Sequence, residues 1–76
     1  MKINEVLIKG EYIRLDDLLK YEGMVETGGH AKFVIQNGEV TLNGEVCTMR
    51  GKKLREGDLI EYDGEKFLVK GGSSPV

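Results

Sequence analysis

The spacing of the apolar residues changes at Gly38, and this change limits the possible folds more than any other feature of the sequence. Before Gly38, the segments 15–19 and 31–35 carry apolar residues at positions i, i+3 and i+4, which is the spacing of a helix with one buried face. After Gly38, apolar and polar residues alternate, as in a strand with one buried face. We therefore predict an α+β protein, with two short helices packed on one face of a small, curved and mostly antiparallel sheet.

Turn and cap residues mark the ends of the predicted elements. Asn43-Gly44 and Asp63-Gly64 are typical of two-residue hairpin turns, and Gly23 and Asn37-Gly38 are typical helix stops. Thr27 is a candidate N-cap of the second helix, because its hydroxyl can accept a hydrogen bond from a first-turn amide.

The predicted order is one strand, two helices and about four strands. The first strand ends before Gly10, and an extended stretch then leads into the first helix. A linker of about four residues joins the helices. The hairpins are expected at 40–49, with a return strand at 46–49, and at 59–69, with a loop at 50–57 between them.

The length of 76 residues suits one small domain, which we place at 1–70, followed by a flexible tail at 71–76 that has nothing to bury. The single cysteine, Cys47, excludes an internal disulfide bond and suits the reducing cytoplasm, where we expect the protein. No apolar run approaches the roughly 20 residues that cross a bilayer, so we expect no membrane partner.

Residues that support catalysis or metal binding are scarce. His30 is the only histidine, and the only serines are Ser73 and Ser74 in the predicted tail. The spacing allows a Cys47–His30 nucleophile pair, but a cysteine in a hairpin strand is more often a small buried side chain. One cysteine and one histidine cannot supply a tetrahedral zinc site. We therefore expect no catalytic residues, no metal site, no cofactor and no small-molecule substrate.

The charges nearly balance overall but are separated along the chain. Eleven basic and thirteen acidic residues give a net charge of −2 and a pI near 5.4. Residues 50–55 hold four basic side chains and no acid, whereas residues 56–65 hold five acids and no base. The basic segment is either a local phosphate-binding patch or a solvated loop that balances the acidic hairpin.

The glycine pair at the start of the second helix is another candidate anion site. Gly28 and Gly29 would let a phosphate approach the backbone amides, and Lys32 adds a positive charge beside them. The alternative is an ordinary glycine-rich turn. With only three tyrosines, two phenylalanines and no tryptophan, a platform that stacks single-stranded bases is not expected. Binding to RNA would then depend on shape and backbone contacts.

Four sequence blocks together resemble the S-four RNA-binding domain, which is also called the alpha-L RNA-binding motif. The blocks are Arg14-Leu15-Asp16-x-Leu18-Leu19-Lys20, Thr27-Gly28-Gly29-x-Ala31-Lys32, Gly38-x-Val40-x-Leu42-Asn43-Gly44-Glu45 and Arg50-Gly51-Lys52-Lys53-Leu54-x-x-Gly57-Asp58. They cover about residues 12–62 in the expected order, and the sequence is most similar to the compact bacterial proteins of the YaaA and YbcJ type. The resemblance implies two helices in an L shape beside a small sheet, binding to structured RNA (often ribosomal or transfer RNA), and no catalytic residues.

The resemblance also implies which residues contact RNA. Arg14 and Lys20 would face the phosphate backbone from the first helix. The other residues are Thr27, Gly28, Gly29, His30 and Lys32 at the second helix, Asn43 at the hairpin turn, and Arg50, Lys52 and Lys53 on a basic rim. Two positions depart from the family pattern: His30 stands where the stand-alone proteins usually carry an acid, and Met49 where an arginine is often found. The expected partner is structured RNA, either free ribosomal RNA or a ribosomal particle.

Two other functions fit parts of the sequence. A ubiquitin-like sulfur carrier would explain the late Gly71-Gly72 pair, but its chemistry requires a C-terminal glycine carboxylate, and four residues follow Gly72. The carrier also gives no reason for the glycine helix start or the basic loop. A protein-interaction module would draw its support from the acidic second hairpin.

Overall fold

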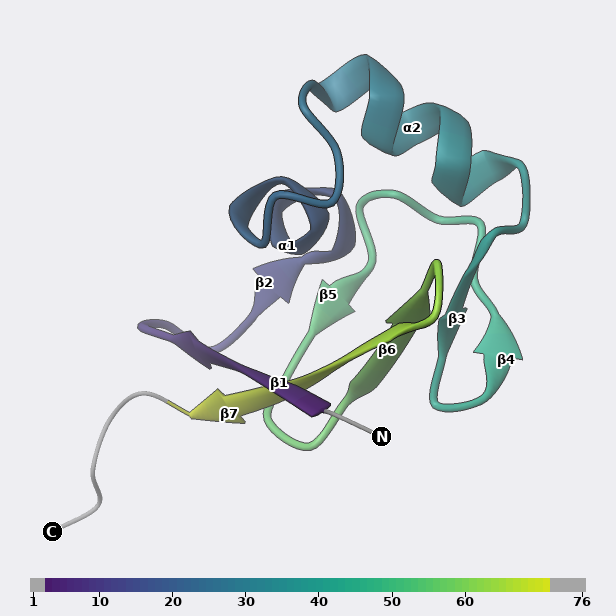
Figure 1. Ribbon diagram of the computed structural model, residues 1–76. Coiled ribbons are helices and arrows are strands. Elements are labelled where there is room, and N and C mark those ends of the chain that lie inside the picture. The colour runs from purple at the N-terminus through teal and green to yellow at the C-terminus, as the bar shows by residue number, and fades with distance from the viewer. Residues whose placement is uncertain (1–2, 72–76) are drawn as a thin grey trace, which may run out of the picture.

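A computed structural model describes residues 3–71 of the chain (Figure 1). The strands are β1 (Ile3–Ile8), β2 (Ile13–Arg14), β3 (Val40–Leu42), β4 (Glu45–Val46), β5 (Lys53–Leu54), β6 (Leu59–Tyr62) and β7 (Glu65–Gly71), and the helices are α1 (Leu15–Tyr21) and α2 (Gly28–Gln36). The tail predicted at 71–76 lies outside the described residues except for Gly71, which is the last residue of β7. Neither helix in the described part of the chain is long and apolar enough to cross a membrane.

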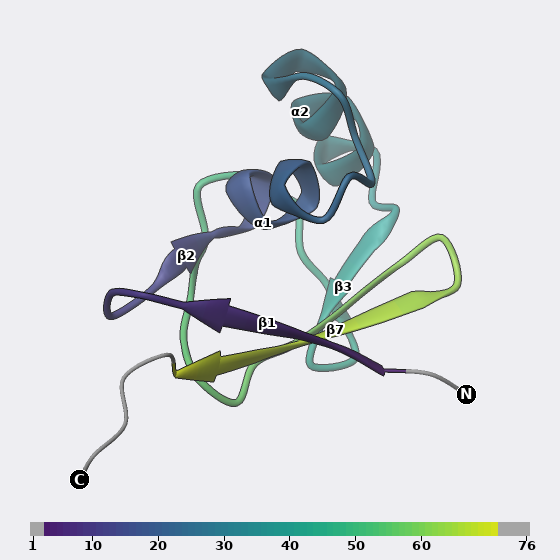
Figure 2. The same ribbon diagram turned by 60° about the vertical axis from the view of Figure 1, so that its left-hand side comes forward.

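The strands form two sheets of unequal size. The larger sheet has the order β1-β7-β6-β3-β4, in which only β1 and β7 are parallel. The smaller sheet is the antiparallel pair of β2 and β5, which we call the β2–β5 ribbon. Both views of the ribbon diagram show α1 and α2 on one side of the larger sheet (Figures 1 and 2). The predicted α+β class and mostly antiparallel sheet are therefore confirmed.

One hydrophobic core joins the helices to both sheets. Side chains along strand β7 point alternately toward the core and away from it. Phe67 and Val69 are buried in the core, whereas Lys66 and Lys70 stand on the opposite face. The core residues are Val6, Ile8, Leu15, Leu18, Leu19, Val25, Ala31, Val34, Ile35, Val40, Leu54, Ile60, Phe67 and Val69. The apolar residues at helical spacing in the sequence are therefore those that α1 and α2 bury.

Local signals in the sequence set most of the element ends. Thr27 has an extended backbone, and its Oγ1 accepts a hydrogen bond of 3.0 Å from the His30 amide, as expected of an N-cap. In both predicted hairpin turns, Asn43-Gly44 and Asp63-Gly64, the two residues have positive φ angles. This backbone is that of a type I′ turn, which matches the twist of antiparallel strands.

Four predicted features differ from the structure. The extended stretch predicted before the first helix contains β2, so two strands rather than one precede α1. The return strand predicted at 46–49 is Glu45–Val46, because the chain leaves β3 after the Cys47 amide donates to the Val40 carbonyl. The loop predicted at 50–57 contains β5, so five strands rather than about four follow the helices. The linker between the helices comprises residues 22–27, longer than predicted, because the stretch after the Gly23 stop buries Val25 in the core.

Candidate nucleic-acid interface

The β2–β5 ribbon carries a basic outer face. Ile13 lies opposite Leu54, and Arg14 lies opposite Lys53. Because side chains alternate along a strand, Leu54 enters the core, where it is 0% exposed, while Arg14 and Lys53 stand on the other face and are exposed. Two segments about forty residues apart in sequence thus bring like charges directly opposite each other, an arrangement that lowers stability.

Tyr12 and Arg55 extend this basic outer face. The Lys53 Nζ lies 4.9 Å from the centre of the Tyr12 ring, and the Arg55 guanidinium carbon lies 6.0 Å from it. Both distances fall within the range of a cation–π interaction. We define the basic ribbon face as Tyr12, Arg14, Lys53 and Arg55.

Backbone hydrogen bonds hold the basic loop before β5 against the start of α1. The Leu15 amide donates to the Lys52 carbonyl at 2.9 Å, and the Asp16 amide donates to the Arg50 carbonyl at 3.0 Å. First-turn amides have no partner within their own helix, so the loop satisfies two groups that would otherwise need water or a cap. Arg50 and Lys52 are thereby brought next to the basic ribbon face.

Asp16 fixes the position of Arg14. One carboxylate oxygen of Asp16 accepts from the Asp17 amide at 2.8 Å, and the other accepts from the Arg14 guanidinium at 3.0 Å. The Asp16 residue is 8% exposed, whereas the Arg14 side chain is 48% exposed. A guanidinium has five N–H donors, so Arg14 can keep this bond and still present donors to a phosphate.

The start of α2 is a second region with room for an anion. Gly28 is half-buried and Gly29 is exposed, and neither has a positive φ. A Cβ atom built on Gly28 meets nothing within 4 Å, and one on Gly29 meets only the Thr27 Oγ1, at 3.9 Å. The fold itself therefore does not require glycine at either position. His30 and Lys32 are both exposed on the same helix.

The structure divides the predicted site residues into groups. It brings together Arg14, Arg50, Lys52 and Lys53 around the start of α1, and places Thr27, Gly28, Gly29, His30 and Lys32 along the start of α2. Lys20, in the last turn of α1, forms an ion pair of 3.6 Å with Asp17. Among the described residues, no hydrogen bond or ion pair joins the first group to the second.

Asn43 has a role inside the fold. Its Oδ1 accepts from the Leu59 amide at 2.9 Å, and its Nδ2 donates to an Asp58 carboxylate oxygen at 3.2 Å. The Asn43 amide also donates to the Leu59 carbonyl at 2.7 Å. These bonds tie the β3–β4 turn to the start of β6, so the Asn43 side chain is already engaged within the protein.

The β6–β7 hairpin end of the molecule is acidic. Burial raises the pKa of the Tyr62 hydroxyl above its usual value of 10.0, and the negative charges of Glu39 and Asp63 raise this pKa further. No cluster of three or more His, Cys, Asp or Glu side chains within residues 3–71 could hold a metal ion. Not all acids of residues 56–65 lie at this end, because an Asp58 carboxylate oxygen accepts a hydrogen bond of 2.8 Å from the Arg55 amide.

Sequence reasoning did not include Tyr12 and Arg55 among the candidate site residues. A pattern in the sequence could have indicated both: in residues 12–14 and 53–55, one apolar residue stands between two basic or aromatic residues. Two such triplets are able to pair with the apolar residues inward and the other side chains outward.

Comparisons with known proteins agree with this architecture. The model of the S4 domain family matches residues 6–70. The chain is 38% identical over 61 residues to RlbA of Bacillus subtilis, a protein named for ribosome maturation. The aligned residues cover 80% of this chain and 86% of RlbA. It is 36% identical over 61 residues to YbcJ of Escherichia coli, which is named as an RNA-binding protein. This alignment covers 80% of this chain and 87% of YbcJ.

A solved structure is also similar to this chain. The solution structure of YbcJ from Escherichia coli, described as an alpha-L motif involved in RNA-binding, superposes with a TM-score of 0.64 and 32% identity. The superposition covers 90% of this chain and 85% of YbcJ. Sequence and fold thus lead to one conclusion: the chain belongs to the S4 domain family.

Proposed function

We propose that this protein is a non-catalytic module that binds structured RNA through its shape and its phosphates. The observation that carries the proposal is the gathering of Arg14, Arg50, Lys52 and Lys53 around the start of α1. A fold that sets Arg14 opposite Lys53 loses stability to charge repulsion, and a polyanion bound across this face would remove that repulsion. The names of RlbA and YbcJ support RNA as the polyanion.

In the proposed complex, phosphates of an RNA stem contact two regions. The guanidinium of Arg14 and the cations of residues 50–53 bind the backbone on one side of α1. Backbone amides at Gly28 and Gly29, with Lys32 nearby, bind it at the start of α2. Lys20 is a further candidate contact, provided that it exchanges Asp17 for a phosphate. Asn43 would contribute by holding its turn in place.

Ribosomal RNA is the class of RNA that we propose, either free or within a ribosomal particle. The support is the name of RlbA, which assigns that protein to ribosome maturation. This partner, together with the single cysteine, suits a cytoplasmic protein.

We propose no catalytic role for the chain. The Cys47 side chain is half-buried, and its thiol lies 3.9 Å from the Met49 carbonyl. The amide of His30 is used by the Thr27 cap, and its ring is exposed on α2. Neither the family nor the relatives above support the sulfur-carrier alternative, which we do not retain.

The proposal is tested by comparing an RNA hairpin with a DNA hairpin of the same sequence. Because A-form RNA and B-form DNA differ in groove shape and in the 2′-hydroxyl, we expect the RNA hairpin to bind more tightly. Fluorescence anisotropy with a labelled hairpin measures both affinities. Equal affinity for the two hairpins, or no binding of the RNA, would contradict the proposal.

The glycine pair offers a test in which stability and binding move apart. Replacing Gly28 and Gly29 by alanine is expected to leave the free energy of unfolding unchanged or to raise it by up to about 1 kcal/mol at each position, because alanine favours the helix and meets no clash. The new methyl groups would keep a phosphate from the amides, so RNA affinity should fall by roughly tenfold. Thermal unfolding and anisotropy report the two quantities.

The matched control for the glycine pair is Gly10→Ala. Gly10 is exposed, lies between β1 and β2, and would also accept a Cβ without contact. We expect this variant to bind the RNA hairpin like the wild type. If the double variant at 28 and 29 also bound like the wild type, the start of α2 would not belong to the interface.

A further inference from the structure

The Tyr12 ring on the basic ribbon face is a notable exposed aromatic. The residue is 42% exposed, and its ring has Lys53 and Arg55 within cation–π distance. Proteins that bind unpaired nucleotides combine these two features, because an aromatic ring stacks on a base while cations hold the backbone. The small number of aromatic residues in the chain had argued against such a site, but one well-placed ring is sufficient for one base.

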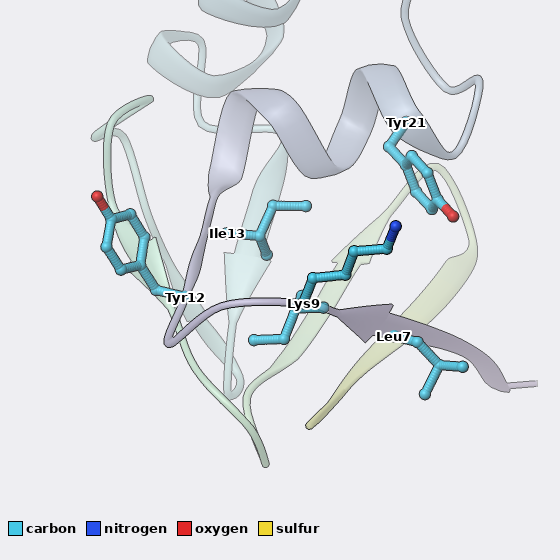
Figure 3. A pocket seen from close by; sticks show the side chains of 6 residues that line it. Leu7, Lys9, Tyr12, Ile13 and Tyr21 are labelled. Carbon is cyan, nitrogen blue, oxygen red and sulfur yellow. The ribbon is translucent and has the colours of Figure 1, made fainter. Parts of the chain in front are cut away.

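A pocket adjoins this ring. Its lining comes from the end of β1, from residues 12–13 and from α1, namely Leu7, Ile8, Lys9, Tyr12, Ile13 and Tyr21. Figure 3 shows the Tyr12 and Ile13 side chains on opposite sides of the chain, and the Lys9 amino group extended away from Tyr12 toward Tyr21. The pocket volume is about 220 Å³, below the roughly 300–1,000 Å³ of sites for drug-sized ligands, so it suits a single ring system.

We propose that one unpaired nucleobase of the bound RNA stacks on the exposed Tyr12 ring at the edge of this pocket, while Lys53 and Arg55 hold the adjoining phosphates. The inference rests on the proposed function, because it names how one nucleotide of that RNA is recognised. A base within a duplex is already stacked and paired, so the nucleotide must come from a bulge, a loop or a strand end.

The charges around the pocket favour a nucleotide over an apolar protein side chain. Lys53 and Arg55 lie beside the Tyr12 ring, Lys9 lines the adjoining pocket, and Glu11 is the acidic residue next to Tyr12 in sequence. A protein side chain would use the apolar walls but would leave these cations without a partner. A nucleotide uses both, since its base is a flat ring and its phosphate is an anion.

The position of Tyr12 also connects the pocket to the proposed stem-binding region. Tyr12 immediately precedes β2 and is two residues from Arg14, which corresponds to a separation of about 6–7 Å in an extended chain. A phosphate held at Arg14 and a base at Tyr12 can therefore belong to neighbouring nucleotides. The proposed complex has a stem on the residues around α1 and one flipped nucleotide beside it.

The test compares a single-stranded oligouridylate with an abasic oligonucleotide that has the same ribose-phosphate backbone. Wild-type protein should bind the oligouridylate more tightly than the abasic strand, because only the former offers bases to Tyr12. Tyr12→Leu keeps an apolar side chain but removes the ring, and it should lower the affinity for oligouridylate by about 5- to 150-fold. Tyr12→Phe retains the ring and should bind within about twofold of the wild type.

A direct reporter is available because the chain has no tryptophan. Tyr12→Trp introduces a single indole, whose emission should be quenched by oligouridylate and not by the abasic strand. Equal binding of both strands by the wild type, absence of oligouridylate binding, or wild-type affinity in Tyr12→Leu would overturn the proposed base contact. Thermal unfolding of each variant shows that the comparison is made on folded protein.

The RNA hairpin separates this inference from the proposed function. A fully paired stem closed by a short, stacked loop offers no free base to Tyr12, so its binding by wild-type protein tests the proposed function alone. If the wild type binds this hairpin, but the wild type and Tyr12→Leu bind oligouridylate with equal affinity, only the proposed base contact is wrong. If the wild type does not bind the hairpin, the proposed function itself fails.

Discussion

The double variant Lys52→Glu, Lys53→Glu is expected to bind an RNA hairpin at least tenfold more weakly than the wild type, a loss of about 1.4 kcal/mol or more in binding free energy. Each substitution removes a cation from the region around α1 and adds a carboxylate that repels phosphate. Both lysines are exposed, so the hydrophobic core is unchanged. Anisotropy with a labelled hairpin at low salt measures the difference.

Stability should not fall with affinity in this variant. Lys53 lies opposite Arg14 in the β2–β5 ribbon, and a glutamate there converts a repulsive pair into an attractive one, worth roughly 0.2–1 kcal/mol. The lost cation–π contact with Tyr12 is worth about as much, so the thermal midpoint should stay nearly constant. A large drop in the midpoint would mean that the lysines support the fold, and the binding result would then have another cause.

The matched control is Lys66→Glu, Lys70→Glu, which changes the net charge by the same amount. Both lysines stand on β7 opposite the buried Phe67 and Val69, on the sheet face away from the helices. This variant should keep most of the RNA affinity. Equal losses in the two double variants would show that net charge, rather than the residues around α1, determines binding.

Leu54→Ala is expected to have the largest effect on stability. Leu54 is fully buried beneath the basic ribbon face, and truncating a buried leucine costs about 2–5 kcal/mol. A chain of this size has a total stability of roughly 4–11 kcal/mol, so the loss is a large share of it. The thermal midpoint should fall by about 10 °C or more. Leu7→Ala, at a residue that is 66% exposed, should change it little.

The same substitution tests how the fold supports the interface. Leu54 is the only residue of β5 in the core, and β5 in turn carries Lys53 and precedes Arg55. If Leu54→Ala cost less than about 1 kcal/mol, the ribbon would not be packed as described. Its basic face would then have no fixed geometry.

The elements that the sequence predicted correctly are those with local signals. The Thr27 cap, the Gly38 helix stop and the turns at 43–44 and 63–64 each depend on a few consecutive residues, and each is confirmed. The alternation of buried and more exposed residues along β6 and β7 could also be predicted, because it too depends only on residues close together in sequence.

The elements that the sequence did not predict depend on contacts between distant residues. Strands β2 and β5 have two residues each, too few to show a period, and their pairing joins Ile13 to Leu54 across about forty residues. The triplets 12–14 and 53–55 are visible in the sequence, but only their pairing places Tyr12 beside Lys53 and Arg55. The internal bonds of Asn43 were hidden likewise, because they reach residues 58–59. Which of the site residues contact RNA stays a prediction.

The salt dependence of RNA binding tests most directly whether the cations around α1 bind phosphates. If the wild type neutralises about five phosphates, the slope of log affinity against log salt concentration should be roughly −3 to −5. In Lys52→Glu, Lys53→Glu the slope should be shallower by about two, and in Lys66→Glu, Lys70→Glu it should match the wild type. The same slope in all three proteins would contradict the account, because the residues that the fold gathers around α1 would then hold no phosphate.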